Sequence, residues 1–103
     1  MVAAVGTTPG AIGYVAFSKL KNSVKTLNIN GVKATADNVT DNSWKIWAYE
    51  LIYTHGEATG VTKSFIDYLL SDTVQKSTVK QTGFIPLSAM KVSKAMNGEV
   101  TKR

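Results

Sequence analysis

The sequence predicts an α/β fold in which strands are followed by a carboxy-terminal pair of helices. Two apolar stretches, at residues 11–17 and 46–54, have the length and side chains of strands, whereas the apolar residues from Val61 onward recur at helical spacing. Hydrophobic residues make up 44% of the 103 residues and charged residues 18%, which is ordinary for a globular protein. A chain of this length forms one domain at most.

Three strands are predicted in the first half of the chain. Residues 11–17 form a nearly continuous apolar run that follows Pro9-Gly10, as is typical of a strand buried on both faces. Residues 24–30 alternate between two faces and end at Asn30-Gly31, a strong signal for a tight turn. The aromatic and aliphatic side chains of residues 46–54 favour a third, longer strand.

Two helical segments have recognisable starts. The Thr35 hydroxyl can accept a hydrogen bond from an orphan amide, which predicts a single capped turn at residues 36–39. After the loop at residues 55–60 comes the clearest helix of the chain, in which the residues at helical spacing are Val61, Phe65, Ile66, Leu69 and Leu70.

A second helix is predicted directly after the first. Ser71-Asp72 can cap it, with Gln75 three residues after Asp72 in an arrangement like a capping box, and Gly83 is expected to end it in the left-handed conformation. Beyond Met90 the sequence becomes polar, and we expect this end to fray.

The charge balance raises nucleic acid as a partner, but the distribution argues against it. The chain has 12 Lys and Arg residues against 7 Asp and Glu, a net charge of +5. All basic residues except Arg103 are lysines, spread from Lys19 to Lys102, so the bidentate groups that read guanine or clamp phosphate are missing. The sequence therefore predicts a solvated lysine surface and no nucleic-acid partner.

Enzymatic and metal-binding residues are also sparse. The absence of cysteine excludes disulfides, thiolate metal sites and thiol nucleophiles. His55 is the sole histidine and is expected in a surface loop, while Glu50 and Glu57 form no close carboxylate pair with Asp67. Asp67 lies four residues after Lys63, a suitable surface ion pair. We expect no enzyme, no catalytic residue, no metal and no cofactor.

The aromatic residues near the middle of the chain allow several interpretations. They can be a platform on which a ligand stacks, or they can pack within a strand, or they can line a hinge or cleft. Packing is the stronger interpretation, because no arginines are interleaved among Trp44, Trp47, Tyr49 and Tyr53.

Four separated stretches, taken together in this order, resemble a known family. They are Thr8-Pro9-Gly10-Ala11-Ile12-Gly13-Tyr14-Val15; Leu27-Asn28-Ile29-Asn30-Gly31-Val32 with Asn38-Val39; Trp47-Ala48-Tyr49 through Tyr53-Thr54; and Gly60 through Phe65-Ile66-Asp67-Tyr68-Leu69-Leu70-Ser71-Asp72 to Gln75-Lys76 and Gly83-Phe84-Ile85-Pro86-Leu87. The resemblance is to the last third of the phosphate-binding proteins of the phosphate ABC transporter, and it covers Val5 to about Val92.

The resemblance implies a place for each part of the chain. It implies part of a periplasmic-binding-protein-like fold of type II, which has two α/β lobes joined by crossing strands. Residues 1–45 would be a remnant of the second lobe, and residues 46–54 the return crossing strand, with Ile46, Trp47 and Tyr49 at the hinge. Residues 55–103 would supply the carboxy-terminal helices that pack on the first lobe.

The resemblance also implies a function. The full protein would be an extracytoplasmic solute-binding component for inorganic phosphate, lipid-anchored and served by a transporter permease, with its export signal absent from this chain. The family's phosphate ligands lie upstream of this region, so no phosphate-binding residue is assigned and the fragment is expected not to bind phosphate alone. The alternative is a small self-associating α/β structural domain, because apolar strands need covering on both faces.

Overall fold

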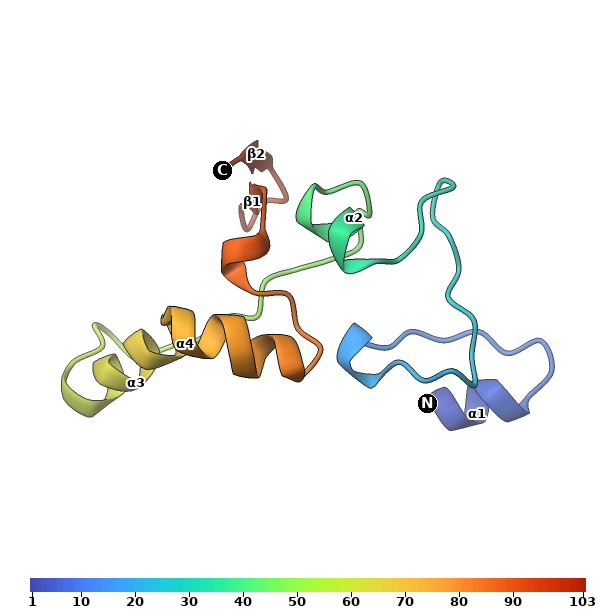
Figure 1. Ribbon diagram of the computed structural model, residues 1–103, viewed down its shortest axis with the longest axis horizontal. Helices are drawn as coiled ribbons and strands as arrows, with labels where there is room; N and C mark the ends of the chain where they lie inside the picture. Colours follow the sequence, from blue (N-terminus) through green and yellow to red (C-terminus); the bar gives the residue numbers. More distant parts are fainter.

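The chain follows an elongated path that contains helical segments and one small sheet (Figure 1). The computed structural model describes all residues from Met1 to Arg103. The α-helices are α1 (Val2–Thr7), α2 (Ala36–Thr40), α3 (Gly60–Leu70) and α4 (Asp72–Val74), and α4 continues into the π-helical turn η2 (Gln75–Val79). Two 3-10 turns, η1 (Phe17–Lys19) and η3 (Leu87–Ala89), and two strands, β1 (Val92–Lys94) and β2 (Val100–Lys102), complete the list.

The predicted helix pair is confirmed as α3 followed by α4 and η2. Lys63 Nζ lies 2.6 Å from Asp67 Oδ2, so the expected surface ion pair forms. Gly83 has φ of +83° and ends the second helix in the left-handed conformation, as predicted.

The capping box predicted at the start of α4 does not form, because the Gln75 side chain makes its hydrogen bonds to other residues. The Ser71 side chain makes no cap hydrogen bond, and Asp72 instead pairs with Lys76 at 2.7 Å. The Gln75 side chain donates from Nε2 to the Leu69 carbonyl at 2.8 Å, and its Oε1 accepts from the Leu87 backbone amide at 3.0 Å. Gln75 therefore ties the end of α3 to the segment that follows the helix pair.

The short capped helix is confirmed as α2. Thr35 has extended backbone angles, and its hydroxyl oxygen accepts a hydrogen bond from the Asn38 amide at 3.3 Å. Thr59 stands at the same position before α3 but makes no side-chain cap bond. The two threonines thus form a natural pair for measuring the cap.

We expect Thr35→Ala to lower the free energy of unfolding by about 1 kcal/mol, because an orphan amide of α2 loses its acceptor. The measurement is urea unfolding followed by tryptophan fluorescence. Thr59→Ala is the matched control and should change the free energy by less than about 0.5 kcal/mol. Equal effects of the two substitutions would show that the Thr35 cap contributes nothing.

None of the three predicted strands forms a strand in the structure. Residues 11–16 and 44–54 have no strand pairing, and residues 24–30 contribute only an isolated bridge between Ile29 and Val32. The reason is that a strand needs a partner for its backbone groups, and these segments have no neighbouring strand in this chain. The turn itself is confirmed, since Asn30 and Gly31 both have positive φ and two hydrogen bonds join Ile29 and Val32.

The carboxy-terminal end does not fray, in contrast to the expectation. β1 and β2 pair antiparallel, with Val92 opposite Lys102 and Lys94 opposite Val100. The Arg103 amide donates to the Lys91 carbonyl at 3.0 Å and closes the open end of this hairpin. The core-facing residues Val92 and Val100 were not recognised from the sequence, because the segment around them is mostly polar. The helix α1 was not anticipated either.

The best-packed part of the molecule surrounds this hairpin. Val39, Met90 and Val92 are buried with 4%, 8% and 8% of their surface exposed, and they form one hydrophobic cluster. Partly buried residues pack around it: Trp44, Trp47, Tyr49, Ile85 and Val100. The Lys91 amide donates to the Thr40 carbonyl at 2.9 Å, so α2 is joined to the start of β1.

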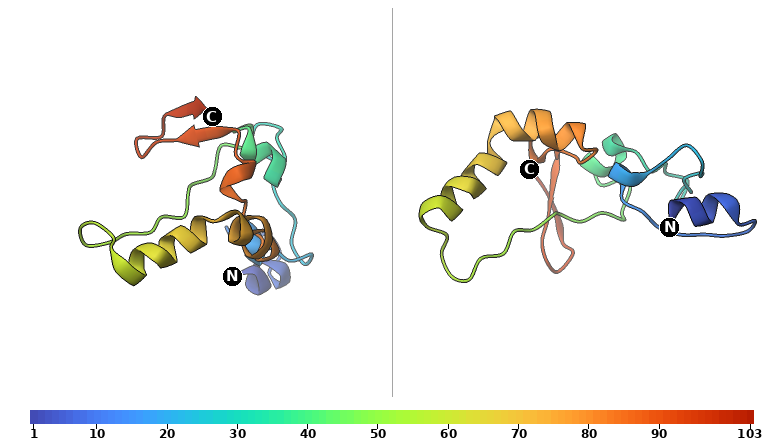
Figure 2. Two further views of the ribbon diagram at one scale, coloured as in Figure 1. Left: turned by 60° about the vertical axis from the view of Figure 1, so that its left-hand side comes forward. Right: turned by 90° about the horizontal axis from the view of Figure 1, so that it is seen from below.

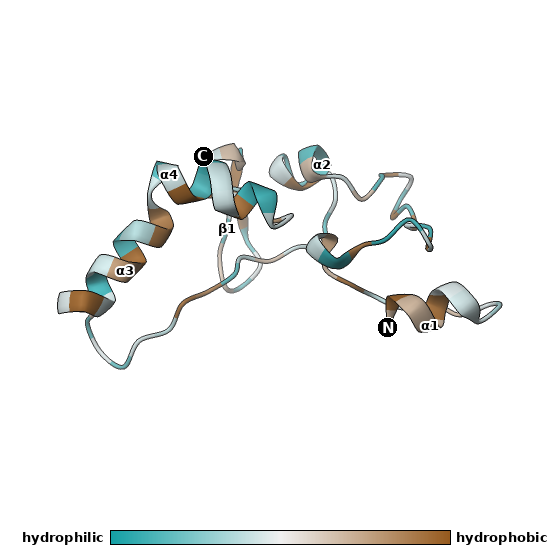
Figure 3. Cartoon of the chain, turned by 60° about the horizontal axis from the view of Figure 1, so that its bottom comes forward, coloured by the Kyte–Doolittle hydropathy of each residue, from teal (hydrophilic) through white to brown (hydrophobic).

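Elsewhere the chain is open. Its radius of gyration is 16.4 Å, against about 13 Å for a compact domain of this length. Its accessible surface is 8142 Å², whereas a compact protein of this mass exposes about 5,700 Å². Figure 2 shows α1 and α3 at opposite ends, and Figure 3 shows hydrophobic residues on both helices and along the extended segments. The α/β composition is confirmed, but most apolar surface is uncovered.

Candidate functional site

The three residues predicted at the hinge behave differently from one another. Trp47 and Tyr49 are half-buried against the hydrophobic cluster, and their rings meet edge to face with centroids 5.4 Å apart and an interplanar angle of 89°. Such a geometry is the favoured one for an aromatic pair. Ile46 lies on the other side of the extended chain and is 67% exposed.

The β1 strand holds the segment that carries Trp47 and Tyr49. The Tyr49 hydroxyl donates to the Val92 carbonyl at 3.2 Å. The Lys94 ammonium donates to the Trp47 carbonyl at 2.8 Å and lies 4.9 Å from the centre of the Trp47 ring. Lys94 is a residue that the sequence did not single out, because the contact joins positions 47 residues apart.

The turn between α2 and this segment is also fixed. The Trp47 indole N–H donates to Asn42 Oδ1 at 2.9 Å, and Asn42 has φ of +64°. The Ser43 side chain hydrogen-bonds to the Asp41 carboxylate, and the Ser43 backbone amide donates to Asp41 Oδ1 at 2.9 Å. These hydrogen bonds lower the pKa of Asp41 below its ordinary value of 3.8. A charged Asp41 therefore helps to hold the turn that leads to Trp47.

The four aromatic residues do not make one ligand-stacking platform. Trp44, Trp47 and Tyr49 pack on the hydrophobic cluster, as the packing interpretation predicts. Tyr53 is 78% exposed and stands apart from them.

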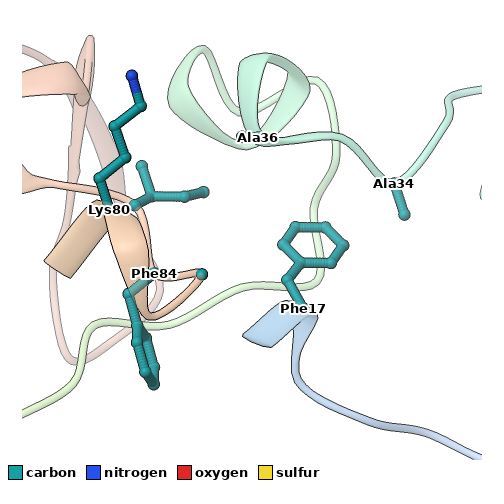
Figure 4. A pocket seen from close by; sticks show the side chains of 7 residues that line it. Phe17, Ala34, Ala36, Lys80 and Phe84 are labelled. Atoms are coloured by element: carbon teal, nitrogen blue, oxygen red, sulfur yellow. The ribbon is translucent and has the colours of Figure 1, made fainter. Parts of the chain in front are cut away.

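A shallow hollow of about 260 Å³ lies between η1, the chain before α2 and the turn after η2 (Figure 4). Phe17 and Phe84 flank it, and Lys80 is its one charged residue. Gly83 allows the Ser18 backbone to lie close to this turn, because a Cβ added at position 83 would lie 2.8 Å from Ser18 Cα. A buried oxyanion needs several convergent donors, which this largely apolar lining does not supply.

The remaining candidates are scattered. His55 is exposed in the loop before α3, and no three residues among His, Asp and Glu come together in a group that could hold a metal. The start of α4 carries Asp72, whose charge repels an anion. No helix is both long and apolar enough to cross a membrane.

Comparison with known proteins identifies the family. No family model matches the chain. The phosphate-binding protein PstS of Bacillus subtilis (strain 168) is 51% identical over 96 residues, which are 92% of this chain. The phosphate-binding protein PstS 2 of Streptococcus agalactiae serotype V is 37% identical over 103 residues. The chain belongs to the PstS-like phosphate-binding proteins.

This PstS-like chain spans about a third of the length of its relatives, 32% of the Bacillus protein and 35% of the Streptococcus agalactiae protein. It corresponds to their carboxy-terminal portion. A third relative, the phosphate-binding protein PstS 2 of Streptococcus pneumoniae serotype 4, is 32% identical over 71 residues. The relatives are named as binding proteins, and none of these names describes an enzyme.

Proposed function

We propose that this chain is the carboxy-terminal portion of the solute-binding component of an ABC transporter for inorganic phosphate. The observation that carries the proposal is 51% identity to a phosphate-binding protein over 92% of the chain. In the full protein the role is to bind phosphate outside the cytoplasm and deliver it to the transporter permease, with a lipid anchor holding the protein at the cell surface. The role is binding, and we assign no catalytic step.

The same proposal assigns the parts of the chain to a two-lobed, type II binding-protein fold. Residues 1–45 belong to the second lobe, residues 46–54 are the return crossing, and residues 55–103 pack on the first lobe. The exposure of α3 supports this assignment. Val61, Phe65 and Tyr68 lie on one stripe of the helix at i, i+4 and i+7 and are 86%, 59% and 59% exposed. A stripe of this kind is what a missing lobe would cover.

The chain alone is not the binding site. The hollow beside Phe17 is largely apolar, and the start of α4 carries the negative charge of Asp72. The phosphate donors therefore come from the two-thirds of the relatives that this chain does not match.

We expect isothermal titration calorimetry to detect no phosphate binding by this chain. A chimera that joins it to the remaining two-thirds of the Bacillus subtilis relative should bind phosphate, with the relative itself as the positive control. A folded chimera that fails to bind phosphate would contradict the proposed function. Specific phosphate binding by the isolated chain would contradict the statement that the donors lie elsewhere.

A self-associating structural domain is the second candidate, and the uncovered surface favours it. The accessible surface of 8142 Å² exceeds that of a compact protein of this mass by about 2,500 Å², which is more than the roughly 800 Å² per partner of a standard interface. Sedimentation that shows only a monomer at high concentration would count against this candidate. A dimer is compatible with the phosphate-binding family, because a fragment can hide its open faces in this way.

A further inference from the structure

We infer that Lys94 is a positioning residue that latches the first half of the crossing segment, around Trp47, to the carboxy-terminal hairpin. The inference rests on the proposed function, in which residues 46–54 cross between the two lobes. It adds a division within that crossing: the half up to Tyr49 is fixed to the hairpin by contacts within this chain, and residues 50–54 are not.

The latch consists of two interactions from one ammonium group. Lys94 Nζ donates to the Trp47 carbonyl oxygen at 2.8 Å and also lies 4.9 Å from the centre of the Trp47 ring. The first interaction holds the backbone and the second holds the side chain. A cation over the face of an indole ring is attracted by the ring's quadrupole, so the same residue fixes both the position and the orientation of Trp47.

Neighbouring contacts make the fixed half a single unit. The Tyr49 hydroxyl reaches the Val92 carbonyl two residues before Lys94, at 3.2 Å. The Trp47 indole reaches Asn42 at 2.9 Å, so the segment is held from α2 as well. Because the hairpin is itself closed at Arg103 and joined to α2 at Thr40, the latch is attached to a fixed support.

Residues 50–54 make no such hydrogen bonds to the hairpin or to α2. None of their backbone groups makes a hydrogen bond to another backbone group, and the Thr54 hydroxyl bonds only to the Gly56 carbonyl of its own loop. Leu51, Ile52 and Tyr53 are 51%, 55% and 78% exposed. The change from chain held by the hairpin to chain without such contacts falls between Tyr49 and Glu50.

The test is backbone NMR relaxation on this chain. We expect order parameters near 0.85 at residues 44–49, as in the hairpin, and below about 0.6 at residues 50–54. Lys94→Met keeps the aliphatic stem but removes the ammonium, and it should lower the values around Trp47 toward those of residues 50–54. Lys94→Arg should restore them, because a guanidinium can both donate to a carbonyl and stack on an indole.

Lys102→Met is the matched control, since Lys102 lies in the paired strand of the same hairpin and makes no contact with Trp47. It should leave residues 44–49 ordered. Tyr49→Phe removes one hydroxyl only and should loosen position 49 while Trp47 stays fixed. The inference fails if residues 44–49 are as mobile as residues 50–54 in the unsubstituted chain, or if Lys94→Met and Lys102→Met have the same effect. None of these measurements involves phosphate, so they separate failure of the latch from failure of the proposed function.

Discussion

Met90→Ala is expected to lower the free energy of unfolding by about 2 to 5 kcal/mol, the range for removing a buried Met side chain. Met90 is 8% exposed and is one of three residues in the hydrophobic cluster, with Val39 and Val92. Truncating it leaves a cavity in a cluster too small to close around the loss. Because small domains are only marginally stable, the hairpin and α2 should separate. Tryptophan near-ultraviolet circular dichroism during urea unfolding measures the effect.

The chain offers a matched control for this substitution. Met96 is 87% exposed in the turn of the same hairpin, and Met96→Ala should change the free energy of unfolding by less than about 0.5 kcal/mol. The comparison removes the effect of the side-chain chemistry and leaves that of burial. Similar losses for Met90→Ala and Met96→Ala would mean that the cluster does not hold this part of the chain together.

Several elements that depend on local sequence were predicted correctly, although the capping box at Asp72 and the helix α1 were not. The Thr35 cap, the Asn30-Gly31 turn, the helix α3 and the stop at Gly83 each depend on residues a few positions apart. The strands failed for the opposite reason. A strand depends on a partner segment, and the sequence of residues 11–17 does not indicate whether that partner is in this chain. The open faces of the structure accompany a match to only about a third of the length of the relatives.

The candidate site was predicted in part. Trp47 and Tyr49 were identified as residues that pack or line a hinge, and the structure places both on the hydrophobic cluster. Their support was missed, because Lys94 is one of eleven lysines with no local pattern to distinguish it. The i, i+2 spacing that puts Val92 and Lys94 on one face of a strand was the only available signal, and fraying was the simpler expectation. The family resemblance, in contrast, came from four motifs in order and is confirmed.

Gly83→Ala is expected to detach the amino-terminal part of the chain from the helix pair. The substitution has two costs. An L-residue at φ of +83° is disfavoured by roughly 1 to 2 kcal/mol. In addition, the new Cβ would lie 2.8 Å from Ser18 Cα, and relieving such overpacking costs about 1 to 3 kcal/mol more. Since the obstructing atom is backbone, η1 has to move away rather than turn a side chain.

Gly98→Ala separates the two costs. Gly98 has φ of +89°, but an added Cβ meets nothing within 4 Å, so this control carries the backbone cost without the collision. We expect nuclear Overhauser effects between Ser18 and the turn at Gly83 to vanish in Gly83→Ala and to persist in Gly98→Ala. The free energy of unfolding should fall further in the first variant. If the Ser18 contact persists in Gly83→Ala, the turn has room for a methyl group and the collision with Ser18 Cα does not hold. If the contact is absent from the unsubstituted chain, η1 is not seated on this turn.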